Sequence, residues 1–125
     1  MTRNAITSDK LPPPVGPFSL GVYGSDLLFL SGQVAQDPAT GKLIDGDAAD
    51  QAEQILRNLA TALAAGGKDL GDVLRVSVYL TDMSDFSAVN AVYGKHFAEP
   101  YPARTAIGVA ALPLGAAVEM DVVVA

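Results

Sequence analysis

The chain has 125 residues, of which 50% are hydrophobic and 18% charged, and its net charge is −6. This length predicts one domain, residues 1–125, with a core that needs no disulfide to fold. The chain has no cysteine and one histidine, which excludes thiolate nucleophiles and the His/Cys zinc site of zinc deaminases. The negative charge argues against a nucleic-acid partner, and no apolar run is long enough to span a membrane. We therefore expect a soluble, cytoplasmic protein.

The first part of the chain predicts an extended segment and then a β-hairpin. Residues 1–15 are expected to be extended, because the run of prolines before Val15 restricts φ and removes backbone donors. Two strand-like runs follow, residues 19–23 and 27–33, on either side of Gly24-Ser25-Asp26. A short turn between two such runs is typical of a hairpin. A further turn is expected at residues 37–41, where proline and glycine occur together.

An amphipathic helix is predicted over residues 47–65. Apolar side chains recur there at steps of three and four residues, and polar side chains lie between them. Asp47 is expected to cap the N-terminus, and Gly66-Gly67 to end the helix where a left-handed residue is favoured. The apolar positions are Ala52, Ile55, Leu56, Leu59 and Leu63.

The second half predicts a strand, a helix and two more strands. Residues 73–80 alternate between apolar and polar side chains, as a strand does. The helix that follows is expected to begin at Asp82 or Ser84 and to end before Pro100. Residues 103–112 and 116–124 then form strands joined by a turn. The order ββαβαββ predicts an α+β fold, a mostly antiparallel sheet with both helices on one face. Since the last strand is partly apolar on both faces, we expect a homo-oligomer to cover the other face.

The candidate ligand-binding residue is Arg104, in the stretch from Glu99 to Thr105. Pro100 and Pro102 restrict the backbone that leads to it, so the side chain has a defined position. A guanidinium donates two parallel hydrogen bonds to a carboxylate, which makes Arg104 a candidate anchor for an organic acid. The alternative is a solvated arginine at the end of a strand.

Several short motifs in the observed order resemble the RidA/YjgF family of enamine and imine deaminases. The matches span nearly the whole chain, and their joint spacing is more specific than any one of them. They are Gly16-Pro17-Phe18-Ser19, Ser31-Gly32-Gln33, Asp37-Pro38-Ala39-Thr40-Gly41, Gln51, Asn58-Leu59, Val78-Tyr79-Leu80-Thr81-Asp82-Met83, Phe86, Val89-Asn90, Tyr101-Pro102-Ala103-Arg104, Ala111-Leu112-Pro113 and Val118-Glu119.

The resemblance implies a chorismate-mutase-like fold, a homotrimer and substrate sites between neighbouring subunits. It also implies hydrolysis of 2-enamino and 2-imino acids, such as 2-aminoacrylate, to 2-keto acids and ammonia, with no metal and no cofactor. Arg104 matches the family's carboxylate-binding arginine, and Glu119 matches the acid that positions water or relays a proton. Ser31 and Gly32 are expected to contact substrate or water, and Asn90 to line or support the site.

Two positions depart from the family pattern. Phe18 replaces a tyrosine, so the ring remains in the substrate site but its hydroxyl is lost. Ala106 replaces a cysteine that is frequent in active members, although there the ligand meets mainly the backbone. The departure at Phe18 leaves open an alternative, a non-catalytic protein that binds small carboxylates or 2-keto acids. RNA cleavage, ascribed to some relatives, is disfavoured by the negative charge.

The lone histidine, His96, is not expected to be catalytic. It lies near the predicted end of the second helix, where a cation is favoured by the helix dipole. No serine or aspartate stands at a spacing that would make it part of a catalytic triad.

Overall fold

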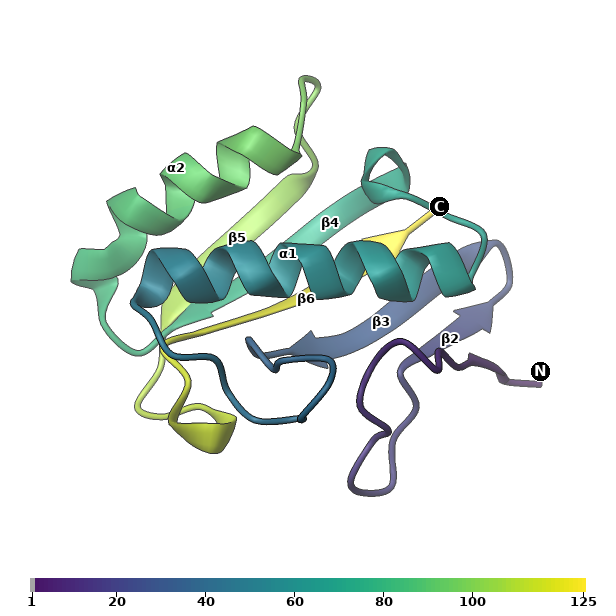
Figure 1. Cartoon of the computed structure of the whole chain (residues 1–125). Helices are drawn as coiled ribbons and strands as arrows, with labels where there is room; N and C mark the ends of the chain where they lie inside the picture. Colours follow the sequence, from purple (N-terminus) through teal and green to yellow (C-terminus); the bar gives the residue numbers. More distant parts are fainter. Residues whose placement is uncertain (1) are drawn as a thin grey trace.

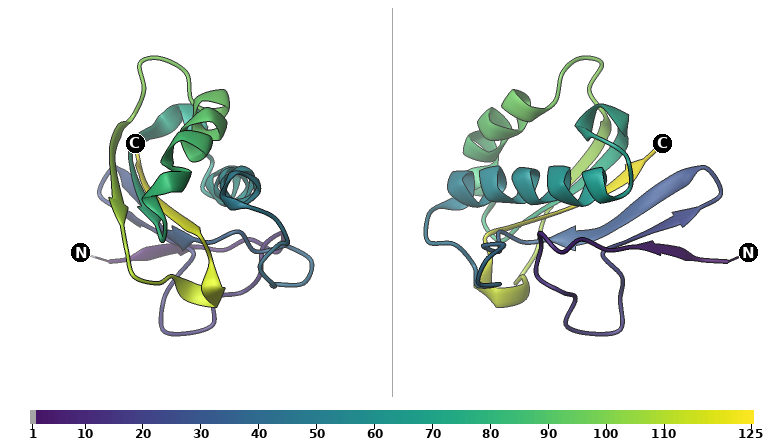
Figure 2. Two further views of the ribbon diagram at one scale, coloured as in Figure 1. Left: turned by 90° about the vertical axis from the view of Figure 1, so that its left-hand side faces the viewer. Right: turned by 45° about the vertical axis from the view of Figure 1, so that its right-hand side comes forward.

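A computed structural model describes residues 2–125 and confirms an α+β fold, with two helices on one six-stranded sheet (Figure 1). The sheet order is β1-β2-β3-β6-β4-β5, and only the β4–β5 pair is parallel. Both helices cover the same face of this sheet (Figure 2, left). The strands are β1 (Asn4–Ile6), β2 (Gly21–Gly24), β3 (Leu27–Gln33), β4 (Val73–Leu80), β5 (Ala103–Gly108) and β6 (Val118–Val124), and the helices are α1 (Ala48–Ala65) and α2 (Phe86–His96).

The N-terminal segment, predicted to be extended, contains one short strand. Asn4–Ile6 form β1, which pairs with β2 and adds an edge strand to the sheet. These residues precede the prolines, so their backbone donors remain available for pairing.

The two final strands are separated in the sheet, although the turn between them suggested direct neighbours. β4 lies between β5 and β6. Because α2 connects β4 to β5, it forms a βαβ crossover that returns the chain parallel to β4. β5 is also shorter than predicted and ends at Gly108, and a 3₁₀ turn, Pro113–Gly115, precedes β6.

α1 has the cap and the buried face that its sequence predicts. Asp47 accepts a hydrogen bond from the backbone N–H of Asp50, and the Asp50 side chain accepts one from the Asp47 N–H. Two buried polar side chains on this helix bind backbone elsewhere in the fold. Gln51 Oε1 accepts a hydrogen bond from the Ala117 N–H at 2.9 Å, and Asn58 Nδ2 donates one to the Gln36 carbonyl at 2.8 Å. These contacts explain why polar residues occupy buried positions.

The core lies between the helices and the sheet, and the opposite face of the sheet is partly exposed. Alternate residues of β4 and β6 are buried against α1 and α2, and the residues between them point away from the helices. Neither helix has the length and apolar character that a membrane crossing requires, considering residues 2–125. We call the other side the open sheet face; it carries Phe29, Arg75, Ser77, Tyr79, Ile107, Glu119, Asp121 and Val123.

Candidate functional site

Arg104 is held by three side chains of α2. It is the second residue of β5, and its Nη1 donates a hydrogen bond to Asn90 Oδ1 at 2.8 Å. Its guanidinium carbon lies 4.7 Å from the ring centre of Tyr93 and 5.5 Å from that of Phe86. Such cation–π contacts favour the charged group over the ring faces. Asn90 therefore holds one side of the guanidinium and leaves its other N–H groups for a ligand.

A hollow of about 460 Å³ adjoins Arg104 between α2 and the start of β5. Burial raises the pKa of Tyr93, and the nearby Arg104 charge opposes that rise only in part. The phenol therefore stays neutral near pH 7. Ala106 follows two residues later on the same face of β5 and is half-buried. We call this region the Arg104 half-site; its hollow is lined by Asn90, Tyr93, Gly94, Tyr101, Pro102 and Arg104.

Glu119 lies on the open sheet face, beside Gly32 of β3. A Cβ added to Gly32 would lie 2.5 Å from Glu119 Oε2, so the carboxylate occupies the space that the glycine leaves. Burial, and then the negative charge of Asp121, raise the pKa of Glu119 above its ordinary value. A raised pKa brings proton exchange by a carboxyl closer to neutral pH, as general acid–base chemistry requires.

Phe18 and Ser31 adjoin Gly32 on the N-terminal side of the same region. Ser31 Oγ donates a hydrogen bond to the Ser19 carbonyl at 2.6 Å, which fixes the segment after Phe18 against β3. The Ser31 hydroxyl thus positions the backbone, and its lone pairs remain as acceptors. Phe18 is 53% exposed and shares with Gly32 a small hollow of about 70 Å³. We call Phe18, Ser31, Gly32 and Glu119 the Glu119 half-site.

The two half-sites lie on opposite faces of the sheet. Arg104 is paired with Val76 and faces α2, and Glu119 is paired with Tyr79 on the open sheet face. β4 separates their strands, which places β5 and β6 about 10 Å apart within the sheet. A small acid bound by Arg104 therefore cannot reach Glu119 of the same chain.

One polar contact at the Glu119 half-site was not predicted from the sequence. Tyr79 Oη donates a hydrogen bond to Asp121 Oδ2 at 3.0 Å, and this contact raises the pKa of Tyr79. Both side chains lie on the open sheet face beside Glu119. Alternation along β4 and β6 predicts that Tyr79 and Asp121 point away from the core. That they are neighbours depends on the pairing register of the two strands, which the alternation does not give.

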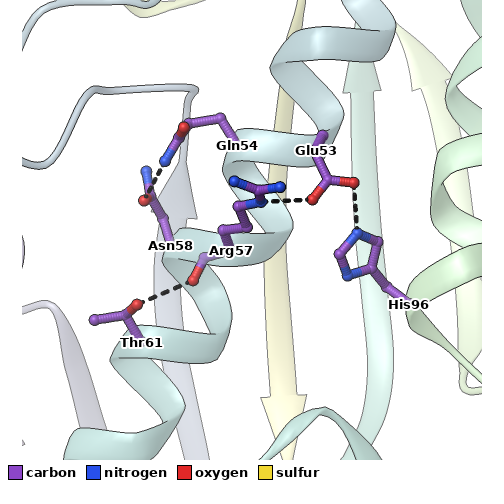
Figure 3. Close-up of polar contacts among 6 residues, drawn as sticks. All are labelled: Glu53, Gln54, Arg57, Asn58, Thr61 and His96. Carbon is purple, nitrogen blue, oxygen red and sulfur yellow. Dashed lines mark hydrogen bonds and ion pairs between the residues drawn. The ribbon is translucent and has the colours of Figure 1, made fainter.

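His96 lies in a different polar cluster, between the two helices (Figure 3). Its Nε2 is 2.8 Å from Oε1 of Glu53, whose Oε2 accepts a hydrogen bond from Arg57 Nε at 2.7 Å. Hydrogen bonds from His96 and then Arg57 lower the pKa of Glu53. The cluster joins α1 to the end of α2, so it gives His96 a structural role. Within residues 2–125, His, Asp and Glu form no group of three that would bind a metal ion.

The comparisons with known proteins extend over nearly all of the chain. The family described as Endoribonuclease L-PSP matches residues 8–125. The 2-iminobutanoate/2-iminopropanoate deaminase of Capra hircus is 41% identical over 123 residues, which cover 98% of this chain and 90% of that protein.

Two solved structures are also similar to this chain over nearly its whole length. The crystal structure of RidA from an Antarctic Psychrobacter superposes with a TM-score of 0.93 at 42% identity, and the match covers 98% of both chains. The structure of E. coli TdcF with bound serine has a TM-score of 0.89 at 33% identity, with 97% of both chains covered. The fold is therefore common to this chain and these proteins over nearly its whole length.

Proposed function

This chain belongs to the RidA/YjgF family, and from that premise we propose that it hydrolyses 2-imino and 2-enamino acids to 2-keto acids and ammonia. The observation that carries the proposal is the guanidinium of Arg104, held by Asn90, Tyr93 and Phe86 beside an open hollow. This arrangement suits a small carboxylate. Relatives named as imine deaminases, at 41% identity, support the reaction class.

The reaction needs one anchor and one water-activating group. Arg104 binds the substrate carboxylate through its remaining N–H groups, which places C2 of the imine next to the site. A 2-enamino acid first tautomerises to the imine, gaining a proton at C3 and losing one from its nitrogen. Glu119 orients a water molecule and accepts its proton as the oxygen adds to C2. Glu119 passes this proton to the nitrogen, which gives a carbinolamine with OH and NH2 on C2. The hydroxyl proton is then transferred to the nitrogen, the C2–N bond breaks, and ammonia leaves as the hydroxyl oxygen becomes the carbonyl of the 2-keto acid.

Both groups act on one substrate only if a second copy supplies Glu119. The open sheet face leaves Phe29 and Ile107 47% and 45% exposed, and a partner that packs on this face would bury both. We propose that these faces pack together in a homotrimer, the assembly that the family resemblance implies. Each site then combines the Arg104 half-site of one subunit with the Glu119 half-site of a neighbour.

The test generates 2-aminoacrylate and 2-iminopropanoate in situ and traps them with semicarbazide. The wild type is expected to suppress semicarbazone formation, and Arg104→Ala is expected not to. Arg57→Ala serves as the matched control, because Arg57 is an exposed residue of α1 that lines neither half-site, and this variant should behave like the wild type. If the wild type leaves trapping of every imine unchanged, the proposed hydrolysis is wrong.

A second candidate is a non-catalytic protein that binds small carboxylates or 2-keto acids. It is favoured by the fact that the Arg104 half-site is complete within one chain and by the loss of a hydroxyl at Phe18. The structure of E. coli TdcF with bound serine supports a small carboxylate as ligand for a related protein. This candidate predicts 2-keto acid binding, abolished in Arg104→Ala, with no effect of the wild type on imine trapping.

A further inference from the structure

Gly94 is a helical glycine that the fold itself does not require. It lies within α2, two residues before the last residue of the helix. Its φ is not in the left-handed region, and a Cβ added there would meet no atom within 4 Å. Glycine in a helix is less stable than alanine, because it loses more backbone freedom on folding. Neither backbone geometry nor packing requires a glycine at position 94. The empty space beside Gly94 is therefore the feature that the absence of a side chain preserves.

That space is the hollow of the Arg104 half-site. Gly94 follows Asn90 by one helical turn and lines the hollow together with Tyr93, Tyr101 and Arg104. The volume of about 460 Å³ lies within the range of small-molecule sites in proteins. A methyl group, the side chain of 2-iminopropanoate, would leave most of it empty. Tyr93, Tyr101 and Pro102 provide ring surfaces in its wall, against which an apolar substituent can pack.

The orientation of the proposed substrate directs its side chain into this hollow. C2 of an imino acid bears the carboxylate, the nitrogen and the side chain. When the carboxylate is on Arg104 and C2 faces the Glu119 half-site of a second copy, the side chain is the substituent that remains on the α2 side. We propose that Gly94 determines substrate specificity by admitting 2-imino acids with long apolar or aromatic side chains. This inference rests on the proposed function.

The experiment narrows the hollow and measures discrimination between substrates. An amino-acid oxidase generates 2-iminopropanoate and 2-imino-3-phenylpropanoate in situ from alanine and phenylalanine. The measured quantity is the ratio of kcat/KM for the phenyl substrate to that for the methyl substrate. Gly94→Leu is expected to lower this ratio by about 100-fold, and Gly94→Ala by about 10-fold, since the added side chain excludes the larger substituent.

Ala91→Leu is the matched control, because Ala91 is exposed on the same helix and does not line the hollow. Its ratio should stay within about twofold of the wild type, as for a surface substitution away from the site. Circular dichroism and thermal melting verify that each variant is folded. If Gly94→Leu does not fold, the same comparison is made with Gly94→Ala. The inference is overturned if the wild type hydrolyses the methyl substrate but rejects the phenyl substrate, or if folded Gly94 variants keep the wild-type ratio.

Binding of the products separates this inference from the proposed function. The dissociation constants of pyruvate and phenylpyruvate are measured for the wild type and Gly94→Leu by titration calorimetry. If no imine is hydrolysed but Gly94→Leu selectively loses phenylpyruvate, hydrolysis is wrong and the specificity pocket stands. If imines are hydrolysed and Gly94→Leu binds both keto acids with the wild-type preference, the pocket is wrong and hydrolysis stands.

Discussion

The Arg104 half-site and the Glu119 half-site are built in different ways. The first comes from one continuous stretch, α2 and the start of β5, and every contact that holds the guanidinium lies within a single chain. The second joins residues from three distant segments, and Gly32 makes room there for Glu119 on the open sheet face. The difference suggests that one chain is sufficient to bind a carboxylate through Arg104. Glu119, the proposed water-activating group, can act on that ligand only when a second copy places it next to Arg104.

Replacing Arg104 should have the largest effect, because it removes the binding half. Each charge-assisted hydrogen bond contributes about 1.5–3 kcal/mol, so the loss of a bidentate pair in Arg104→Ala should lower kcat/KM by about 10²–10⁴-fold. The change should include a raised KM, measured by steady-state trapping kinetics. Arg104→Lys keeps the positive charge but lacks the planar guanidinium, so its kcat/KM should lie between those of the wild type and Arg104→Ala. A wild-type kcat/KM in Arg104→Ala would contradict the assignment.

Replacing Glu119 should affect turnover more than binding. Glu119→Gln keeps the shape and removes the proton acceptor, so kcat should fall by about 10²–10⁴-fold. KM and the affinity for 2-keto acids should change little, because the Arg104 half-site is intact. Steady-state kinetics and product titration measure the two effects separately. A variant that loses affinity but retains kcat would reverse the roles of the two halves.

Gly32→Ala tests how closely the Glu119 half-site is packed. The new Cβ would lie 2.5 Å from Glu119 Oε2, so the carboxylate must move. Displacement of a catalytic group by about 1 Å lowers rates by as much as 100-fold, so a loss of about 10–100-fold in kcat is expected. Gly24→Ala is the control, because a Cβ at Gly24 has open space, and its kcat should match the wild type. Equal kcat values for the two variants would show that Glu119 does not need its observed position.

Asp121→Asn should give the smallest effect, a shift in pH dependence. Asp121 contributes to the raised pKa of Glu119, after burial, because the two negative charges repel. Glu119 accepts a proton only when ionised, so kcat/KM should fall as pH drops below its pKa. Removing the neighbouring charge lowers that pKa, and the acid limb of the kcat/KM profile should move to lower pH. An acid limb that stays in place or moves to higher pH would exclude Glu119 as the titrating base.

Local features of the fold were predictable from the sequence. The apolar spacing and the capping residue Asp47 predict α1 because both act within a few residues of the chain. Alternation along β6 likewise places Glu119 on the face opposite the core. The family motifs identify Arg104, although its position near α2 depends on the structure.

Features that join distant segments were not predictable in the same way. The position of β4 between β5 and β6 depends on how α2 packs, and short sequence patterns carry no such information. The pair Glu53–His96 spans 43 residues and requires the helix packing to be known. In the sequence, Gly94 is marked only by being a glycine within a predicted helix. Its proposed role in substrate specificity follows from the empty space beside it in the structure.

The most direct test of a site shared between copies is complementation between two inactive variants. Arg104→Ala and Glu119→Gln are co-expressed with different affinity tags, and mixed oligomers are purified and assayed by imine trapping. In every mixed cyclic trimer, one of the three interfaces combines an intact Arg104 with an intact Glu119. The shared site predicts recovery of about one third of wild-type activity by that count. Mixed oligomers that form but remain as inactive as either parent would contradict it.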